Sequence, residues 1–252
     1  MSKRYKNPPI MEVIFEVNLS QDTSWDLAVP GLIYEKIKDR FPIREPRVVQ
    51  EVNFVSGPDG IKQEVRTSER TLFFQNDRKM LVQVGPRIIS LHSLKFYPGW
   101  DNFKSVIEDV YKALNEVVSI KGLERLALRY INRIDIRGER IEPSHFFEVY
   151  IHLGENLPQD MVNFNLECIF PFEEGRDLCK LQLFSPRPPI PPQNVLSLFL
   201  DIVYFLANPG SVKSEEVLEW TEKAHKEIER IFEGSITDRL REQFERSESE
   251  YD

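Results

Sequence analysis

The sequence predicts an α+β fold of two similar halves, residues 1–121 and 122–252, each running strand, helix, several antiparallel strands and helix. Two observations predict this fold. Runs of alternating apolar and polar residues, bounded by turn sequences, occur in both halves and indicate strands with one buried face. Amphipathic helical patterns over Asp101–Val118 and Ser214–Phe232 follow the strands of each half. This order of elements favours sheets packed against long helices.

The first half opens with an alternating strand at Ile10–Leu19. A helix is expected from Pro30, a residue suited to the first helical position, to Phe41, because Pro42 ends it. Five strand-like runs follow between turn sequences, and they cover Val48–Val55, Ile61–Thr67, Thr71–Gln75, Met80–Val84 and Arg87–Leu94.

The second half is expected to contain three strand regions and three helices. The strand regions are Arg125–Arg137, a hairpin of Asn163–Phe170 with Leu178–Phe184, and Asn194–Leu206. The helices are a short one around Ser144–Ile151, the helix capped by Ser214, and a last short one near Thr237, with either a capping box of Ser235 and Asp238 or Thr237 as its cap. The polar tail Arg246–Asp252 is expected to be frayed.

The segment Arg125–Arg137 carries arginines at every fourth position. As a strand, it places these on one face: Arg125, Arg129, Arg133 and Arg137. Its other face is apolar apart from Asn132, whose buried amide needs a hydrogen-bond partner. The same spacing would also form a stripe on a helix. Tyr130, Ile131 and Ile134 favour the strand, because aromatic and β-branched residues fit a pleated sheet.

A candidate ligand site combines six polar residues from three predicted strands: Arg129, Asn132, Arg133, Glu12, Glu16 and Asp201. Glu12 and Glu16 have the same spacing as the two arginines. The two sets would form either a ladder of cross-strand ion pairs or an acid- and arginine-lined cleft, in which guanidinium groups recognise carboxylate or phosphate. Asp201 lies on a largely apolar strand face, where an arginine of the central strand or Asn132 would serve as its partner.

Charge and motif content narrow the function classes. The formal net charge of −8 argues against nucleic-acid binding across the whole surface, so any such binding would need a local basic face. No apolar run approaches the roughly 18–20 residues of a membrane span, and no secretory signal is recognised, so we expect a cytoplasmic protein without membrane contact. Phosphate-binding loops, nucleophile elbows and zinc-ligand spacings are missing from the sequence. The sequence therefore predicts no catalytic residue, cofactor or metal site.

Two further features each allow two interpretations. A turn centred between Glu173 and Glu174 would place Cys168 directly opposite Cys179, close enough for a disulfide, whereas a cytosolic protein favours two reduced, buried thiols. The proline-rich segment Ser185–Gln193 favours a polyproline II conformation, either as a stiff loop between two strands or as a docking ligand.

Three segments together resemble the signature positions of a sporadically distributed family of uncharacterised bacterial and archaeal proteins. They are Asn7-Pro8-Pro9-Ile10 followed by Glu12, the block Arg129-Tyr130-Ile131-Asn132-Arg133, and Phe232 followed by Ile236-Thr237-Asp238 and Phe244. The resemblance spans nearly the whole chain and implies no established activity. Its patchy distribution implies an accessory factor of mobile or defence-related loci.

We therefore expect a non-catalytic binding or interaction protein, with an unknown protein or a small anionic ligand as its partner. A homodimer is compatible with the sequence, because two-fold dimers are the commonest soluble oligomers. One alternative is an enzyme acting on a nucleotide or another phosphorylated small molecule, with Asp201 or Glu16 as base. Another is local nucleic-acid binding through the arginine face.

Overall fold

The computed structural model describes residues 5–57, 60–95, 97–138, 141–159, 161, 163–186 and 195–245, with residues 50–67 described by their backbone. Three predicted features lie outside the described residues. They are the middle of the turn at 57–60, most of the proline-rich segment Ser185–Gln193, and the tail Arg246–Asp252.

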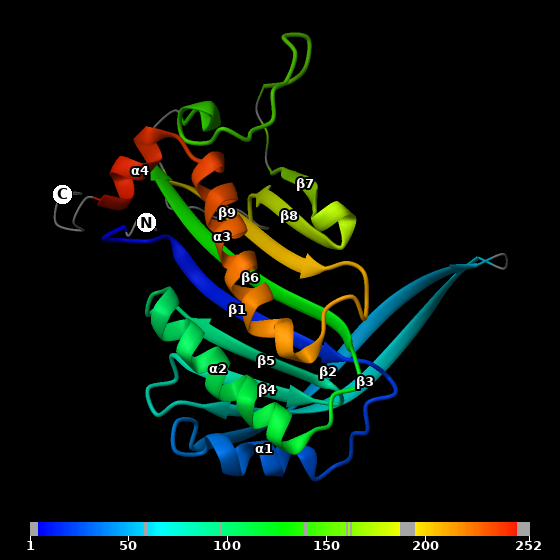
Figure 1. Ribbon diagram of the computed structural model, residues 1–252. Helices are drawn as coiled ribbons and strands as arrows, with labels where there is room; N and C mark the ends of the chain where they lie inside the picture. Colours follow the sequence, from blue (N-terminus) through cyan, green and yellow to red (C-terminus); the bar gives the residue numbers. More distant parts are fainter. Residues whose placement is uncertain are drawn as a thin grey trace. The chain divides into compact units, whose positions relative to one another are not determined.

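The described strands form one antiparallel sheet of nine strands, ordered β2-β3-β4-β5-β1-β6-β9-β8-β7 (Figure 1). The prediction of two similar halves is wrong, because the strands of both chain halves form a single sheet, in which β1 and β6 are neighbours. The first half contributes five strands and the second half four. The strands are β1 (Ile10–Leu19), β2 (Ile43–Gly57), β3 (Gly60–Phe74), β4 (Met80–Gly85), β5 (Ile88–Leu94), β6 (Leu123–Arg137), β7 (Asn165–Phe172), β8 (Asp177–Phe184) and β9 (Val195–Leu206).

Two of the predicted strand runs belong to one long strand. Ile61–Thr67 and Thr71–Gln75 were expected to be separate, but β3 continues through the polar residues between them. These residues remain paired with β2, where Ser68 lies opposite Val49 and Arg70 opposite Arg47. Pairing along the neighbouring strand satisfies the backbone, so a polar stretch does not interrupt the strand.

The described residues form four α-helices besides the sheet: α1 (Val29–Ile37), α2 (Trp100–Val117), α3 (Val217–Ser235) and α4 (Asp238–Glu245). The two amphipathic patterns are confirmed as α2 and α3. The short helix expected around Ser144–Ile151 is wrong, since only a single 3-10 turn, η1 (Pro143–His145), forms there. The backbone that follows pairs with a distant segment, where Phe147 forms a bridge with Ile236 and the Glu148 N–H donates to the Ser235 carbonyl at 2.9 Å.

The chain divides into two compact units. Unit 1 comprises Met1–Val13, Ala127–Asn208 and Leu218–Asp252, and unit 2 comprises Ile14–Leu126 and Pro209–Val217. In unit 2, α2 buries its apolar face, including Phe103, Ile107 and Leu114. In unit 1, the apolar sides of β6, β8 and β9 are buried, including Leu128, Leu181 and Leu200. Each unit therefore has its own hydrophobic core.

The predicted helix caps are replaced by other contacts. The Ser214 side chain donates to Asn115 Oδ1 at 3.0 Å and contacts the Tyr111 hydroxyl at 2.8 Å, while Lys213 occupies the capping position before η3 (Ser214–Glu216). At α4, the Thr237 carbonyl accepts the first helical hydrogen bonds, but its hydroxyl donates to the His145 carbonyl at 2.8 Å. These serine and threonine hydroxyls thus tie distant segments together.

The two cysteines are free, and the predicted register of their hairpin is wrong. Cys168 lies opposite Leu181, and Cys179 lies opposite Phe170. The turn contains η2 (Glu173–Gly175), whose residues all have positive φ angles of 49°, 56° and 88°. This turn moves the centre of the hairpin to between Glu174 and Gly175, so the two cysteines are diagonal neighbours on one face.

The two thiols should differ in reactivity. Burial raises the pKa of the Cys179 thiol to about 12, whereas Cys168 is only partly buried. Because the thiolate is the reactive form, we expect a disulfide reagent at pH 8 to label Cys168 rapidly and Cys179 only after denaturant is added. Titrating native Cys168→Ser and Cys179→Ser variants assigns each phase. Equal labelling rates for the two thiols in the native protein would contradict this prediction.

Candidate functional site

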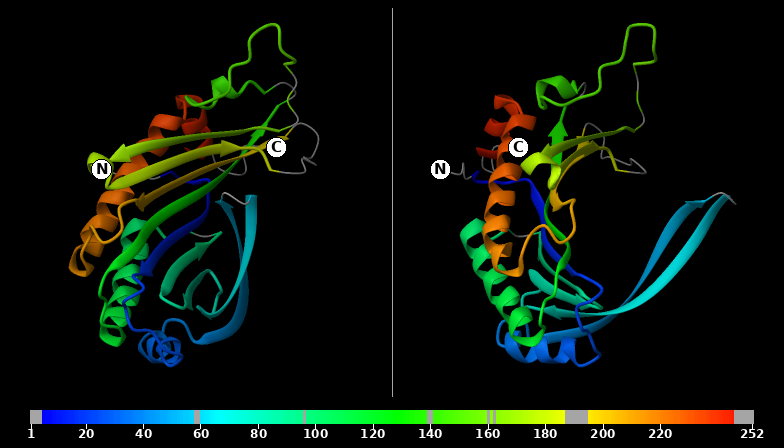
Figure 2. Two further views of the ribbon diagram at one scale, coloured as in Figure 1. Left: turned by 90° about the vertical axis from the view of Figure 1, so that its right-hand side faces the viewer. Right: turned by 45° about the vertical axis from the view of Figure 1, so that its right-hand side comes forward.

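The sheet of unit 1 has two unlike faces. Helix α3 lies against one of them (Figure 2), where the Tyr130 hydroxyl is 3.0 Å from His225 Nδ1 and the rings of Tyr204 and Trp220 meet at 5.5 Å. Alternation along β6 and β9 points Arg129, Arg133 and Asp201 to the other side, which we call the distal face. The helix-facing side chains of β6 and β8 in this unit are buried, so the polar groups of these strands that a ligand could reach lie on the distal face.

The strand register arranges the distal face in three rows that cross β6, β9, β8 and β7 in that order. The first row is Arg129, Val203, Lys180 and Ile169, the second is Ile131, Asp201, Gln182 and Glu167, and the third is Arg133, Phe199, Phe184 and Asn165. We call the third the aromatic row. Cations, carboxylates, amides and aromatic rings are thus brought together from four strands.

A two-point ion pair connects the first and second rows. Arg129 donates from Nε to Asp201 Oδ1 at 2.8 Å and from Nη2 to Oδ2 at 2.5 Å. The Asp201 side chain is 2% exposed, whereas that of Arg129 is 42% exposed. Such a fork-to-fork pair fixes the guanidinium in one orientation. It also engages both oxygens of Asp201, so this carboxylate is not arranged to accept a proton from a substrate.

Arg133 holds a more exposed position on the same strand. Its side chain is 53% exposed, and its Nε lies 3.2 Å from Asp135 Oδ1. The Ser197 hydroxyl donates to the same carboxylate oxygen at 2.6 Å. Because Asp135 is itself half-exposed, water screens this ion pair and weakens its hold on Arg133. The Arg133 guanidinium is therefore placed to exchange partners with a ligand.

Two stacked phenylalanine rings stand beside Arg133 in the aromatic row. Phe199 lies directly opposite Arg133 on β9, and Phe184 lies opposite Phe199 on β8. The ring centroids are 5.3 Å apart and the planes differ by 13°. Both rings are only partly buried. A half-exposed aromatic stack next to an exposed guanidinium can receive a planar group and an anionic group at once.

Cross-strand pairs also join β8 to the edge strand β7. Lys180 Nζ lies 3.6 Å from Glu167 Oε2, and Gln182 Nε2 donates to Asn165 Oδ1 at 2.8 Å. Each of these pairs joins a residue of one row to a residue of the next row, as the Arg129–Asp201 pair does between β6 and β9. Each contributes little to stability at an exposed site. Together they fix the orientation of the polar groups around the aromatic row.

The structure brings together three of the six predicted site residues, Arg129, Arg133 and Asp201. Asn132 is buried on the face toward α3, where its Nδ2 donates to the Leu200 carbonyl at 3.0 Å. Its amide is thus satisfied by backbone, and Arg129 is the partner of Asp201.

The two predicted glutamates of β1 fall in different units. Glu12 belongs to unit 1 and is partly buried. Glu16 belongs to unit 2, where its Oε1 lies 3.5 Å from Arg125 Nε. Arg129 thus pairs with Asp201, Arg133 with Asp135, and Glu16 with Arg125.

Sequence reasoning missed Lys180, Gln182, Phe184 and Phe199 as site residues. The alternation along β8 contains the signal, because Cys179, Leu181 and Leu183 are buried and the residues between them must face the other way. What the sequence could not supply is the register that sets Phe184 beside Phe199 and Phe199 beside Arg133.

Asp177 forms a second buried polar cluster, on the side of the sheet that faces α3. It is fully buried, and it accepts hydrogen bonds from Trp220 Nε1 at 3.0 Å, the Tyr204 hydroxyl at 3.1 Å and Arg176 Nη2 at 2.6 Å. Burial and the nearby carboxylate of Asp177 raise the pKa of Tyr204 well above its ordinary value, so its hydroxyl remains a donor. This arrangement fixes α3 on the sheet.

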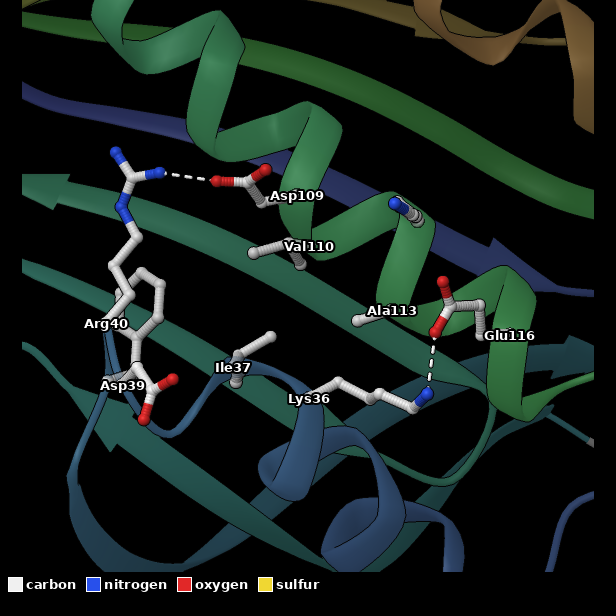
Figure 3. Close-up of a pocket in the computed structure, with 10 residues that line it drawn as sticks. Lys36, Ile37, Asp39, Arg40, Asp109, Val110, Ala113 and Glu116 are labelled. Carbon is white, nitrogen blue, oxygen red and sulfur yellow. Dashed lines mark hydrogen bonds and ion pairs between the residues drawn. The ribbon is translucent and has the colours of Figure 1, made fainter.

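A shallow groove in unit 2 lies between α1 and α2 (Figure 3). Its volume is about 270 Å³, and Ile37, Val110 and Ala113 line its floor. Two ion pairs cross it, Arg40 with Asp109 at 2.6 Å and Lys36 with Glu116 at 2.7 Å. These ion pairs join the end of the α1 region to α2, so the groove is the seam between two packed helices.

The segments that carry the family resemblance meet in unit 1. The Arg133 N–H donates to the Pro9 carbonyl at 2.8 Å, and the Asn7 N–H donates to the Phe244 carbonyl at 2.9 Å. The Tyr5 ring contacts those of Phe232 and Phe244 edge-on, at 6.4 and 5.3 Å. These contacts connect the chain's start, β6 and α4, so the three motifs have a shared structural role.

A scan against protein-family models and a search of the curated proteins both gave no match to this chain. Within the ranges that the structure describes, no three histidine, cysteine, aspartate or glutamate side chains gather as metal ligands would. None of the helices in the described part of the chain is both long and apolar enough to cross a membrane.

Proposed function

We propose that the protein is a cytoplasmic, non-catalytic binding protein whose ligand surface is the distal face of unit 1. The observation that carries this proposal is the aromatic row, in which exposed Arg133 adjoins the stacked rings of Phe199 and Phe184. This combination suits a small molecule with a planar group and an anionic group. Stacking favours the planar group, and the guanidinium favours carboxylate or phosphate.

The surroundings of the aromatic row support binding over catalysis. Asp201 lies in the neighbouring row, but both of its oxygens accept hydrogen bonds from Arg129. Asp135 already accepts from the Ser197 hydroxyl and contacts Arg133. A general base needs an oxygen within hydrogen-bond reach of the substrate proton. The carboxylates here are instead used to orient the arginines.

A thermal-shift screen tests the proposal. The panel pairs benzoate, phenyl phosphate and nucleotides with acetate and inorganic phosphate, which lack the ring. We expect compounds with both groups to raise the melting temperature, because a ligand at 100 times its Kd stabilises the folded state by about 2.7 kcal/mol. The rise should be lost in Arg133→Ala and Phe199→Leu.

The control is Arg230→Ala, which removes the same charge from α3, where Arg230 is exposed and pairs with Glu227 at 2.8 Å. This variant should keep the full thermal shift. If no compound with both groups stabilises the wild type, or if all three variants respond equally, the distal face is not the ligand surface.

A further inference from the structure

We propose that the distal face takes a mononucleotide, whose base stacks on the ring of Phe184 and whose phosphate is held by Arg133. This inference rests on the proposed function and names the ligand class of the same site. Four features of the face support it, namely the position of the rings, the amide pair beside them, the separation between Arg133 and Phe184, and the distribution of charge.

The position of Phe184 suits a base. Phe184 and Phe199 stack on each other, so one ring face of Phe184 is covered by Phe199. Its other face is directed to β7, where the opposite residue is Asn165, a short side chain at an exposed position. A planar base placed there extends the existing stack. Every nucleobase has such a π-face, and base–aromatic stacking is a large term in nucleotide recognition.

The amide pair next to Phe184 matches the edge of a base. Gln182 Nε2 donates to Asn165 Oδ1 at 2.8 Å. This bond leaves the Gln182 carbonyl oxygen as an acceptor and the Asn165 amide nitrogen as a donor. Adjacent donors and acceptors are what the edges of nucleobases present, and side-chain amides pair with them readily. A simple aromatic acid has no such edge, so the amide pair favours a nucleobase.

Arg133 lies at a suitable separation for the phosphate. It is two strands away from Phe184 in the same row, which corresponds to about 9–10 Å between strand axes. A base on the β7 side of Phe184 lies one stacking distance, about 3.5–4 Å, farther from Arg133. The sugar and phosphate extend from the base over the edges of the two rings toward Arg133, and the long arginine side chain spans the rest of the separation. The guanidinium then binds phosphate through two parallel N–H donors.

The charge distribution favours a mononucleotide over a nucleic-acid strand. On the distal face Arg129 is paired with Asp201, Arg133 with Asp135, and Lys180 with Glu167. A carboxylate therefore accompanies each of these cations, and the chain carries a net charge of −8. Binding a polyanion depends on a track of positive charge along its backbone. A single phosphate needs one guanidinium.

The test is a calorimetric titration of the full-length chain with the four nucleoside monophosphates. The comparison ligands, titrated in the same way, are the matching nucleosides, ribose 5-phosphate, phenyl phosphate and a single-stranded hexanucleotide. We expect at least one nucleoside monophosphate to bind more tightly than its nucleoside, ribose 5-phosphate and phenyl phosphate.

Three variants assign the contacts. Phe184→Leu should weaken nucleotide binding about ten- to hundredfold, and Phe184→Trp should retain it, since stacking is the contribution removed. Arg133→Ala should abolish the preference for nucleotide over nucleoside. If the melting temperature of Phe184→Leu equals that of the wild type, its weaker binding is not a consequence of unfolding. If the melting temperature of Phe184→Leu falls, Asn165→Ala is used instead, because it tests the amide contact without removing a ring.

The outcomes separate this inference from the proposed function. Binding of phenyl phosphate without any preference for nucleotides overturns the inference and leaves the proposed function standing. If the hexanucleotide binds far more tightly than any mononucleotide, the ligand is a single-stranded nucleic acid and the mononucleotide proposal is overturned. Failure of every ligand overturns both the inference and the proposed function.

Discussion

Arg129→Ala is expected to lower the free energy of unfolding by about 3–5 kcal/mol, because it leaves the buried Asp201 carboxylate without its partner. Asp201 is 2% exposed and receives two hydrogen bonds from the Arg129 guanidinium. Urea unfolding at neutral pH, followed by circular dichroism, measures the change.

The control for this prediction is Arg133→Ala, on the same strand and the same face. Its partner Asp135 is 45% exposed, so removing Arg133 should cost at most about 1 kcal/mol. Replacing both members of the buried pair, in Arg129→Met with Asp201→Leu, should recover most of the loss, since no buried charge remains unpaired. Equal losses in Arg129→Ala and Arg133→Ala would show that the burial of Asp201 has no energetic consequence.

Asp177→Ala should destabilise the protein by a similar amount, about 3–5 kcal/mol, for a different reason. It removes the acceptor shared by Trp220, Tyr204 and Arg176. The first two donors are buried, and each buried donor left unsatisfied costs about 1–3 kcal/mol. Thermal unfolding monitored by tryptophan fluorescence measures the loss and reports on the surroundings of Trp220.

Asp238→Ala provides the matched control for this second prediction. Asp238 also pairs with an arginine, Arg241 at 2.7 Å, but its side chain is 93% exposed. Its removal should cost less than about 1 kcal/mol. Trp220→Phe removes one donor and keeps the carboxylate, so its loss should fall between the two. A small loss in Asp177→Ala would mean that water can reach Trp220 and Tyr204.

Local sequence patterns predicted most of the individual elements. The alternation in Ile10–Leu19 gave β1 with its bounds, and that in Arg125–Arg137 gave β6 to within two residues. The three–four spacing of apolar residues located α2 and α3. These predictions succeed because alternation and helical periodicity depend on residues close together in the chain.

The candidate site could be predicted only in part. The sequence identified Asp201 as an acid in need of a partner, either an arginine of the central strand or Asn132. It did not single out Arg129, which is 72 residues away. Phe184 did not stand out as a site residue, because its role depends on lying opposite Phe199 on another strand. Pairing register is set by turns and by tertiary contacts, as the shift in the cysteine hairpin shows.

By itself the sequence determined which faces of the strands and helices are apolar, and hence that Arg129 and Arg133 project from the polar face of their strand. Only the tertiary structure decided that β1 and β6 lie in one nine-stranded sheet. It also decided that the aromatic row forms beside Arg133. The physical reason is that side-chain direction follows from local backbone geometry, whereas the neighbours of a strand are chosen by burial and hydrogen bonding across the whole chain.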